Sequence, residues 1–372
     1  MVLEWLRLVD FRNITQADLR FHPELNLLIG GNGQGKSNLL EAVGLLATGR
    51  SFRRSPPEAL RRHGCKGFHL QGTVHAFDLT HRLEFQGVGN RQTAQLNGKP
   101  VAMASSMDRV LAAVLLTPDS PDLVHGGPGA RRDYLDWVVF SNQRRHATTV
   151  RDYQNALKAR NRLLKEKTLH PGEMDAWEDR LAVLGARILV SRNHMLQRLR
   201  EPLPFFLDAL GLDSPLFQLS YASQLNHDGT CVEEKDLANQ YRQLLKQHRG
   251  NDHRLRATST GPHRDDVRFS CSERPLDRFG SRGQKKRFML ALKLSELQLL
   301  QTAVHAKPLL LLDDPAAELD GDGVRRLLKL VQRQGQQLLI TAVKGDDFSS
   351  AQLPYQAFHV QAGQFKPEYP QS

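Results

Sequence analysis

The sequence is poor in cysteine and has no long hydrophobic run. Its three cysteines are widely spaced and odd in number, which excludes a disulfide framework and a paired-cysteine metal site. No apolar stretch approaches the roughly 20 residues that a membrane-spanning helix requires. Charges at Glu4, Arg7 and Asp10 would interrupt the apolar core of an N-terminal signal peptide. We therefore expect a reduced, soluble, cytoplasmic protein without a membrane partner.

The composition is that of a folded protein with excess positive charge. The 372 residues predict two to three structural units at roughly 150 residues each. Apolar residues make up 40% and charged residues 24%, which argues against general disorder. The formal net charge of +11 indicates a polyanionic partner, and the lack of a membrane segment favours nucleic acid.

The chain divides into three predicted regions, at residues 1–125, 126–256 and 257–372. The first opens with strand-like stretches and then alternates apolar and polar residues from Phe68 to Leu96. The Asn97-Gly98 pair that follows is a strong hairpin signal. We expect a strand–loop–helix unit beside an antiparallel β patch.

The second region is predicted to be helical. A heptad seam with one polar member runs through Met174, Trp177, Leu181, Leu184, Ile188, Ser191 and Met195. A weaker helical pattern covers Arg151 to Lys167, and Pro171-Gly172 marks a turn between the two helices. Because helices joined by a short turn lie antiparallel, we expect an inserted, projecting helical arm. The alternative is that these helices cap a globular core.

The third region alternates helix and strand. Helices are expected after Ser281 and over Gly323–Gln334, and strands at Leu309–Leu312 and Gln337–Thr341. This alternation is typical of a parallel sheet in an α/β fold. Residues 366–372 are expected to form a loose tail.

A glycine-rich segment fits the P-loop pattern of glycine, four residues and Gly-Lys-Ser. It consists of Gly30, Gly31, Asn32, Gly33, Gln34, Gly35, Lys36 and Ser37. An apolar strand precedes it and a helix-forming stretch follows it, which is the context that the motif requires. The backbone N–H groups should surround phosphate oxygens, Lys36 should reach the β- and γ-phosphates, and Ser37 should bind Mg²⁺.

An acidic pair follows the strand of four leucines. Asp313 and Asp314 stand at its carboxyl end, where open α/β sheets bind their ligands. We expect Asp313 to hold the Mg²⁺ shell and Asp314 to orient the attacking water. The alternative is a strand that simply ends in an aspartate turn.

A third motif, Ser281-Arg282-Gly283-Gln284, heads a predicted helix. Ser281 is a good N-cap, and a helix N-terminus with serine and glycine can bind phosphate. On local grounds alone, an ordinary helix cap is the favoured interpretation of this segment.

Together these motifs resemble the ATP-binding-cassette heads of the SMC class and, within it, the RecF family of bacterial DNA replication and repair ATPases. Further matching segments are Phe11-Arg12-Asn13, Gly49–Arg53, Thr117–Asp119, Arg131–Asp136, Thr260–Asp266 and Leu309–Asp320. The run Gly-Pro-His-Arg-Asp-Asp at 261–266 is the most distinctive of them. The resemblance implies an SMC-type P-loop ATPase head with an inserted helical arm.

The resemblance also implies an ATP-dependent homodimer. ATP and Mg²⁺ would lie between two subunits, with the P-loop of one facing Ser281, Gly283 and Gln284 of the other. It further assigns Arg12 and Asp320 to the nucleotide site, with Ala317–Asp320 crossing the dimer interface. Such a dimer would act at single-strand gaps and at junctions of double- and single-stranded DNA, with RecO and RecR, to load RecA. ATP binding would close the dimer and hydrolysis would open it.

Two departures from cassette ATPases bear on the mechanism. Asp314 stands where these enzymes place a catalytic glutamate, and its shorter side chain predicts slow hydrolysis. The residues after Thr341 include no histidine at the usual switch position, which leaves the γ-phosphate sensor unassigned. His263 is a candidate for a functional contact, or a structural histidine in a buried turn.

The helical region carries much of the excess positive charge. Residues 141–200 contain 13 Lys/Arg and 6 Asp/Glu, a net charge of +7. We expect salt-sensitive, sequence-independent contacts with DNA phosphates. The candidate residues are Arg144, Arg145, Lys158, Arg160, Arg162, Lys165 and Lys167. The alternative is a solvated basic face.

Three alternative functions can each be distinguished from this one by a sequence feature or a binding test. An SMC-like ATPase of a nuclease-coupled defence system needs a cluster of metal-binding carboxylates, yet only three acidic residues follow Asp322. The ATP-binding subunit of a transporter would carry a Leu-Ser-Gly-Gly signature, which is absent. A binding module with an inactive ATP site would be excluded by Mg²⁺-ATP binding that Lys36→Ala abolishes.

Overall fold

The computed structural model describes residues 1–53, 55–101, 107–117, 122–166, 171–225, 233–315, 321–344 and 354–368. The chain forms two compact units. Unit 1 comprises residues 1–120, 205–212 and 282–372, and unit 2 comprises residues 121–204 and 213–281. Unit 2 extends past residue 256 because strand β9 (Phe217–Ala222) pairs with β10 (Asp266–Cys271). No helix in the described ranges has the length and apolarity to cross a membrane.

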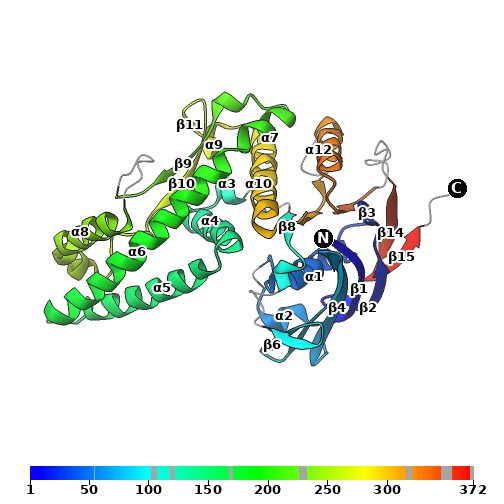
Figure 1. Ribbon diagram of the computed structural model, residues 1–372, viewed down its shortest axis with the longest axis horizontal. Coiled ribbons are helices and arrows are strands. Elements are labelled where there is room, and N and C mark those ends of the chain that lie inside the picture. Colours follow the sequence, from blue (N-terminus) through cyan, green and yellow to red (C-terminus); the bar gives the residue numbers. More distant parts are fainter. Residues whose placement is uncertain are drawn as a thin grey trace. The chain divides into compact units, whose positions relative to one another are not determined.

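Unit 1 contains a six-stranded sheet that is parallel except at one edge (Figure 1). Its order is β15 (Gln364–Glu368), β14 (Tyr355–Gln361), β3 (Leu25–Ile29), β13 (Leu338–Ala342), β12 (Leu309–Leu312) and β8 (Ala113–Leu116). The parallel pairing of β14, β3, β13, β12 and β8 confirms the predicted sheet. The predicted loose tail is wrong for residues 366–368, which pair with β14. Residues 369–372 lie outside the described residues.

A second, antiparallel sheet of unit 1 confirms the predicted β patch. Its order is β2 (Ile14–Arg20), β1 (Val2–Phe11), β4 (Gly67–Ala76), β5 (Leu79–Val88), β6 (Arg91–Leu96) and β7 (Lys99–Val101). The turn between β6 and β7 is Asn97-Gly98, as predicted, with φ of 52° and 77°. Leucines of β1 and β4 share one buried core with helix α1 (Lys36–Thr48).

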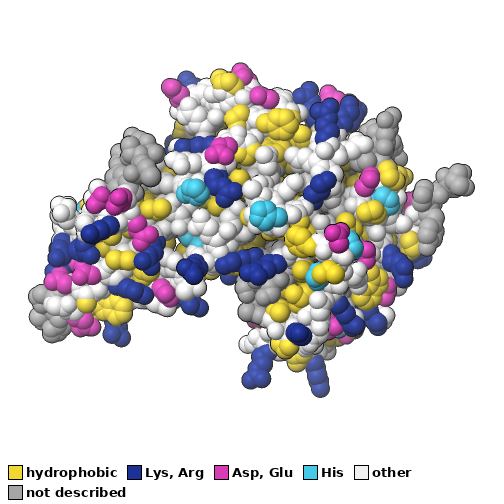
Figure 2. All heavy atoms as spheres, viewed as in Figure 1, with side chains coloured by type: hydrophobic (Ala, Val, Ile, Leu, Met, Phe, Trp, Pro, Cys, Tyr) yellow, Lys and Arg dark blue, Asp and Glu magenta, His cyan; other side chains and the backbone are white. Residues whose placement is uncertain are grey.

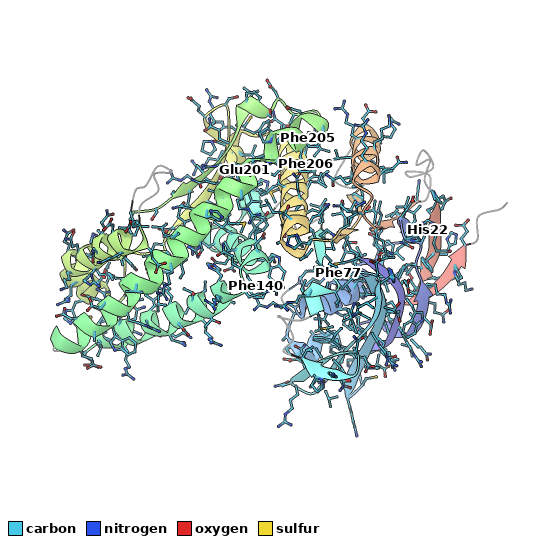
Figure 3. All side chains as sticks on the ribbon, in the orientation of Figure 1. His22, Phe77, Phe140, Glu201, Phe205 and Phe206 are labelled. Atoms are coloured by element: carbon cyan, nitrogen blue, oxygen red, sulfur yellow. The ribbon has the colours of Figure 1, made fainter. Side chains whose placement is uncertain are left out.

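Side-chain hydrogen bonds fix the start of β3, the strand that leads into the P-loop. At His22, labelled in Figure 3, the backbone N–H donates to Asn26 Oδ1 and the carbonyl accepts from Asn26 Nδ2, both at 2.8 Å. The buried Gln337 amide donates to the carbonyls of His22 and Leu3, and its Oε1 accepts from the Leu3 N–H at 2.8 Å. One side chain thereby links the two sheets of unit 1.

The remaining elements of unit 1 are helical. They are α2 (Pro57–Leu60), the 3₁₀ turn Met107–Arg109, α10 (Arg282–Val304) and α12 (Gly321–Gln334). Helix α10 begins directly after Ser281, and α12 covers its predicted span. Most of helix α7 (Leu203–Ala209) also belongs to unit 1. In α7, Phe205 is exposed and packs edge-to-face on the buried Phe206 (Figure 3).

Unit 2 is built on three helices, α5 (Arg145–Leu163), α6 (Pro171–Arg200) and α8 (Glu234–Leu255). Leu163 and Leu164 pack near Met174, whereas Tyr153 packs near Ile188. Helices α5 and α6 therefore run antiparallel, as predicted. The predicted turn at Pro171-Gly172 is wrong, because both residues lie in the first turn of α6, where proline needs no hydrogen-bond donor.

A small sheet and short helices complete unit 2. The sheet order is β11 (Arg274–Pro275), β10 and β9. The helices are α3 (Asp122–His125), α4 (Pro128–Asn142), α9 (Leu276–Phe279) and the 3₁₀ turn Ser214–Leu216. Helix α4 packs on α6 and β10, which places the end of the Gly-Pro-His-Arg-Asp-Asp run beside it.

Candidate nucleotide-binding site

The glycines of the P-loop are required by its geometry. A Cβ at Gly30 would lie 2.2 Å from the Val360 carbonyl oxygen, because β14 runs beside the loop. Gly33 and Gly35 have φ of 76° and 118°, a region that side chains disfavour. Helix α1 begins at Lys36, so its first N–H groups are directed toward the loop. The segment therefore forms a backbone cradle at a helix N-terminus, as a phosphate requires.

A hydrogen-bonded chain connects the P-loop helix to the acidic pair. Ser37 Oγ donates to Asp313 Oδ1 at 2.8 Å. Thr341 Oγ1 donates to the same oxygen at 2.7 Å and accepts the Asp314 backbone N–H at 2.8 Å. Asp314 itself adopts φ of 49°, in the left-handed region. Three strands of the parallel sheet thus bring Ser37 and both carboxylates to one edge.

Lys36 occupies the centre of this arrangement. Its Nζ donates to the carbonyl oxygens of Gly30 and Gly31, and its side chain is buried. Burial lowers the pKa of Lys36, while the nearby carboxylates of Asp314 and Asp313 oppose that shift. The ammonium is held inside the loop by carbonyl dipoles, in the position of a group that a phosphate would contact.

An open pocket of about 310 Å³ lies over these residues. It is lined by residues 32–38, Arg53, Asp313, Asp314 and Thr341. Gly30 and Gly31 line a neighbouring hollow with Gln34 and residues 359–361 of β14. The structure therefore gathers most of the predicted P-loop residues and both aspartates around one space.

Three lining residues were missed by sequence reasoning. Thr341 lies near the carboxyl end of β13, the strand beside the one that carries the acidic pair, and this position could have predicted its role. Arg53 ends the Gly49–Arg53 segment that resembles the RecF family but was given no role at the nucleotide, and its Nη1 donates to Asn38 Oδ1 at 2.7 Å. No feature of the sequence distinguishes Asn38 from any other residue of a helix.

Arg12 does not line the pocket. Its Nε and Nη2 both donate to Glu41 at 2.8 Å, and Nη1 donates to the Ala59 carbonyl. Glu41 is fully buried and also accepts from Ser51 Oγ. Since this bidentate pair uses the planar fork of the guanidinium, Arg12 holds the 51–59 segment against α1 in this structure.

The Ser-x-Gly-Gln segment is not part of this pocket. Ser281 and Gly283 are exposed at the start of α10, and Gln284 is half-buried. Their predicted role requires the P-loop of another subunit, so it stays a prediction. Asp320 and the rest of Ala317–Asp320 lie outside the described residues.

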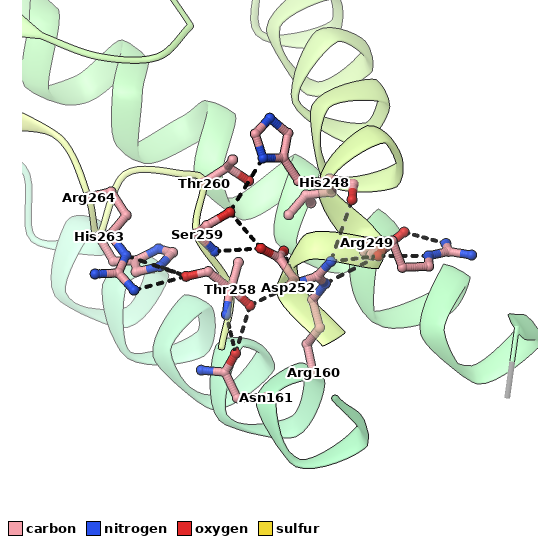
Figure 4. Close-up of polar contacts among 12 residues, drawn as sticks. Arg160, Asn161, His248, Arg249, Asp252, Thr258, Ser259, Thr260, His263 and Arg264 are labelled. Carbon is pink, nitrogen blue, oxygen red and sulfur yellow. Dashed lines mark hydrogen bonds and ion pairs between the residues drawn. The ribbon is translucent and has the colours of Figure 1, made fainter. Parts of the chain in front are cut away.

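The Gly-Pro-His-Arg-Asp-Asp run belongs to a buried polar network of unit 2 (Figure 4). His263 Nε2 donates to the Thr258 carbonyl at 3.1 Å, which leaves Nδ1 to accept from the Tyr153 hydroxyl at 2.7 Å. Burial, together with Arg264 and Arg132, lowers the pKa of His263 to about 4. These contacts match the structural alternative for His263.

Arg160 is part of the same network, and its predicted contact with DNA is wrong. Its side chain has no exposed surface. The guanidinium donates to Glu178 at 2.9 Å, Asp252 at 2.8 Å and Thr258 Oγ1 at 2.8 Å (Figure 4). It therefore joins three helices and the loop before the distinctive run.

The other basic candidates of the helical region remain on the surface. Arg145, Lys158, Arg162 and Lys165 are exposed, and Lys167 lies outside the described residues. Arg144 is half-buried, with its guanidinium over the Phe140 ring at 5.1 Å, and burial lowers its pKa. Positions 151, 158 and 162 share one face of α5, opposite the buried His146, Tyr153 and Arg160, and Arg144 and Lys165 lie just outside its two ends. Arg151, which is also exposed, is a further member that the sequence analysis missed.

The pocket fits Mg²⁺ and ATP by its donor set. Ser37 Oγ and Asp313 are hard oxygen ligands held together, as Mg²⁺ prefers. The glycine loop ends at the N-terminus of α1, where backbone N–H groups can bind phosphate, and a lysine ammonium lies inside the loop. A cluster of three or more metal-ligating side chains, as a nuclease would need, is absent from the described residues.

Comparisons with known proteins agree with this geometry. Residues 2–366 match the family model described as RecF/RecN/SMC N terminal domain. The chain is 49% identical to the DNA replication and repair protein RecF of Magnetococcus marinus, over 98% of this chain and 97% of that one. It is 34% identical to RecF of Trichlorobacter lovleyi, over 92% and 91%.

Solved structures extend the comparison to three dimensions. A structure of the recombination mediator protein RecF with ATP superposes with a TM-score of 0.86 at 29% identity, covering 98% of this chain and 99% of that one. The Smc head domain of Pyrococcus furiosus gives a TM-score of 0.56 at 14% identity, covering 99% and 96%, which is a likeness of fold alone.

Proposed function

Because the chain belongs to the RecF family of DNA replication and repair ATPases, we propose that it is an ATP-gated DNA clamp with slow hydrolysis. ATP binding joins two copies, the joined form binds DNA, and hydrolysis separates them. The observation that best supports this proposal is the chain of hydrogen bonds that links Ser37, Asp313, Thr341 and Asp314 at the P-loop. It places the two expected Mg²⁺ ligands, Ser37 and Asp313, and the carboxylate of Asp314 at one pocket.

Each residue of the pocket has a separate task. The loop N–H groups and Lys36 bind the phosphates, and Ser37 with Asp313 holds Mg²⁺, which neutralises phosphate charge when bound. Thr341 fixes both the Asp313 carboxylate and the Asp314 backbone. Asp314 orients water and accepts its proton. Its side chain is one methylene shorter than glutamate, so hydrolysis is slow and serves as a switch.

Dimerisation places the Ser-x-Gly-Gln segment of one copy against the nucleotide of the other. The exposure of Ser281 and Gly283 at the start of a 23-residue helix supports this role. The phosphate charge would then be shared by two helix N-termini. Asp320 and its neighbours would lie at the same interface.

DNA is bound through the basic face of α5, formed by Arg151, Lys158 and Arg162, together with Arg144, Arg145 and Lys165 at the two ends of the helix. The face is free of buried side chains and spans most of the helix. Its members would contact phosphates without reading bases, which suits gaps and junctions of double- and single-stranded DNA. Membership of the family supports action in the cytoplasm with RecO and RecR, loading RecA for recombinational repair, fork maintenance and the SOS response.

Light scattering after size exclusion tests the proposal with gapped DNA and Mg²⁺-ATP present. Wild type should dimerise with ATP, and Asp314→Asn should remain dimeric because it binds ATP but does not hydrolyse it. Lys36→Ala should lose about 100-fold in ATP affinity, since it removes charge-assisted contacts, and should stay monomeric. A wild type that stays monomeric at saturating ATP with DNA would contradict the clamp.

A further inference from the structure

Helix α12 of unit 1 has an exposed face that is almost entirely cationic. Val324, Leu327, Leu328 and Val331 are buried, whereas Arg325, Arg326, Lys329 and Arg333 are exposed. Figure 2 shows dark-blue side chains gathered over this helix. Only Arg325 has an acidic partner among the described residues, the exposed Asp322 one turn earlier.

This arrangement works against the stability of the helix itself. Arg325 and Lys329, and again Lys329 and Arg333, are like charges four residues apart, and such pairs repel. A face that serves only solubility would mix both signs along the helix. This row of cations, Arg325, Arg326, Lys329 and Arg333, is therefore suited to an anionic partner that neutralises the repelling charges.

A second helix adds a cation beside the row. Arg287 of α10 donates to the Gly211 carbonyl at 3.4 Å. A Cβ on Gly211 would lie 2.4 Å from Arg326 Nη1 and 3.6 Å from Arg287 Nη1. Gly211 also has φ of 77°, so glycine is required there by both backbone and space. The two guanidinium groups thus converge over one glycine.

We propose that this α12 surface, Arg325, Arg326, Lys329, Arg333 and the adjacent Arg287, binds the phosphate backbone of duplex DNA. From Arg325 to Arg333 the row measures about 12 Å. That length matches about three to four phosphates along one strand, at about 3.4 Å of axis each. A straight row on a rigid helix fits the regular phosphates of a duplex. The inference rests on the proposed DNA-binding function and adds a contact surface on the ATPase unit, separate from α5.

The test is the salt dependence of duplex binding. The variant Arg326→Ala/Lys329→Ala/Arg333→Ala keeps helix-forming residues and should lower the slope of log K against log salt by about 2.7, at about 0.9 per phosphate contact. Its basal ATP hydrolysis should match wild type, and its urea midpoint should be equal to or slightly above that of wild type because like-charge repulsion along the helix is removed. The matched control is Arg7→Ala/Arg20→Ala/Lys66→Ala, which removes the same charge from exposed positions of unit 1 and should keep the wild-type slope.

An unchanged slope in the α12 variant, or equal losses in both triple variants, would overturn the α12 surface. A parallel measurement on Lys158→Ala/Arg162→Ala/Lys165→Ala separates this result from the proposed function. If that variant loses affinity while the α12 variant does not, DNA binding through α5 stands alone. If wild type itself binds no duplex at low salt, the proposed function fails.

Discussion

Polar side chains are used differently in the two units. At the P-loop of unit 1, Lys36, Asp313 and Asp314 border an open pocket, and their hydrogen bonds go to two backbone carbonyls and to the hydroxyls of Ser37 and Thr341. In unit 2, Arg160 and its partners are fully buried, with the guanidinium saturated by carboxylates and a hydroxyl. The first arrangement leaves bonding capacity for a ligand, and the second has none left. Charge at the P-loop therefore serves chemistry, and charge in the Arg160 network serves architecture.

Arg160→Ala should break the architecture of unit 2. Removing the guanidinium leaves Asp252 and Glu178 buried with fewer partners, which should lower the free energy of unfolding by about 3–5 kcal/mol. Urea denaturation measures this loss. The control is Arg162→Ala, two residues away and exposed, which should change stability by less than about 0.5 kcal/mol. Equal effects of the two substitutions would contradict the architectural role of the buried Arg160 network in unit 2.

The pH dependence of stability tests whether the fold keeps His263 neutral. Its pKa of about 4 lies below the ordinary 6.5, so the unfolded chain binds the proton more tightly. The contribution of neutral His263 to the free energy of unfolding is fully present above pH 6.5. It is lost as the pH falls toward 4, and the total loss is about 3 kcal/mol at most. His263→Gln should flatten the fall in unfolding free energy over that window. A variant with an unchanged pH profile would show that His263 is not held neutral by the fold.

Thr341→Val should have the smallest effect on stability and a specific effect on the reaction. It keeps the shape but removes the hydroxyl between Asp313 and the Asp314 backbone, at a cost of about 1 kcal/mol. We expect ATP binding to persist and hydrolysis to fall about tenfold, which single-turnover assays would measure. Thr341→Ser retains the hydroxyl and should recover activity. Failure of serine to do so would assign the effect to packing.

The sequence predicted best what depends on neighbouring residues. The strand β3, the glycine loop and the helix α1 follow one another in the chain, so the sequence pattern over residues 25–48 predicted all three parts of the P-loop. The strand 309–312 was located by its four leucines. In each case local preference and the final fold agree.

Roles set by distant partners were not predictable. Arg160 looked like its exposed neighbours until the fold placed Asp252 and Thr258, more than 90 residues away, against it. Arg12 was assigned to the nucleotide site because Phe11-Arg12-Asn13 resembles the family, yet its guanidinium donates two hydrogen bonds to Glu41. Arg151, by contrast, could have been found from the sequence, because it precedes Lys158 by seven residues, a spacing that places both on one helix face.

The bond between Ser37 and Asp313 joins residues 276 positions apart. During synthesis the glycine loop therefore leaves the ribosome well before the Asp313 carboxylate and Thr341. Until residue 341 has emerged, the chain has only the Ser37 half of this magnesium site. Nucleotide can stabilise the ATPase unit through the complete site only after that point, so this source of stability arises late in the folding of the unit.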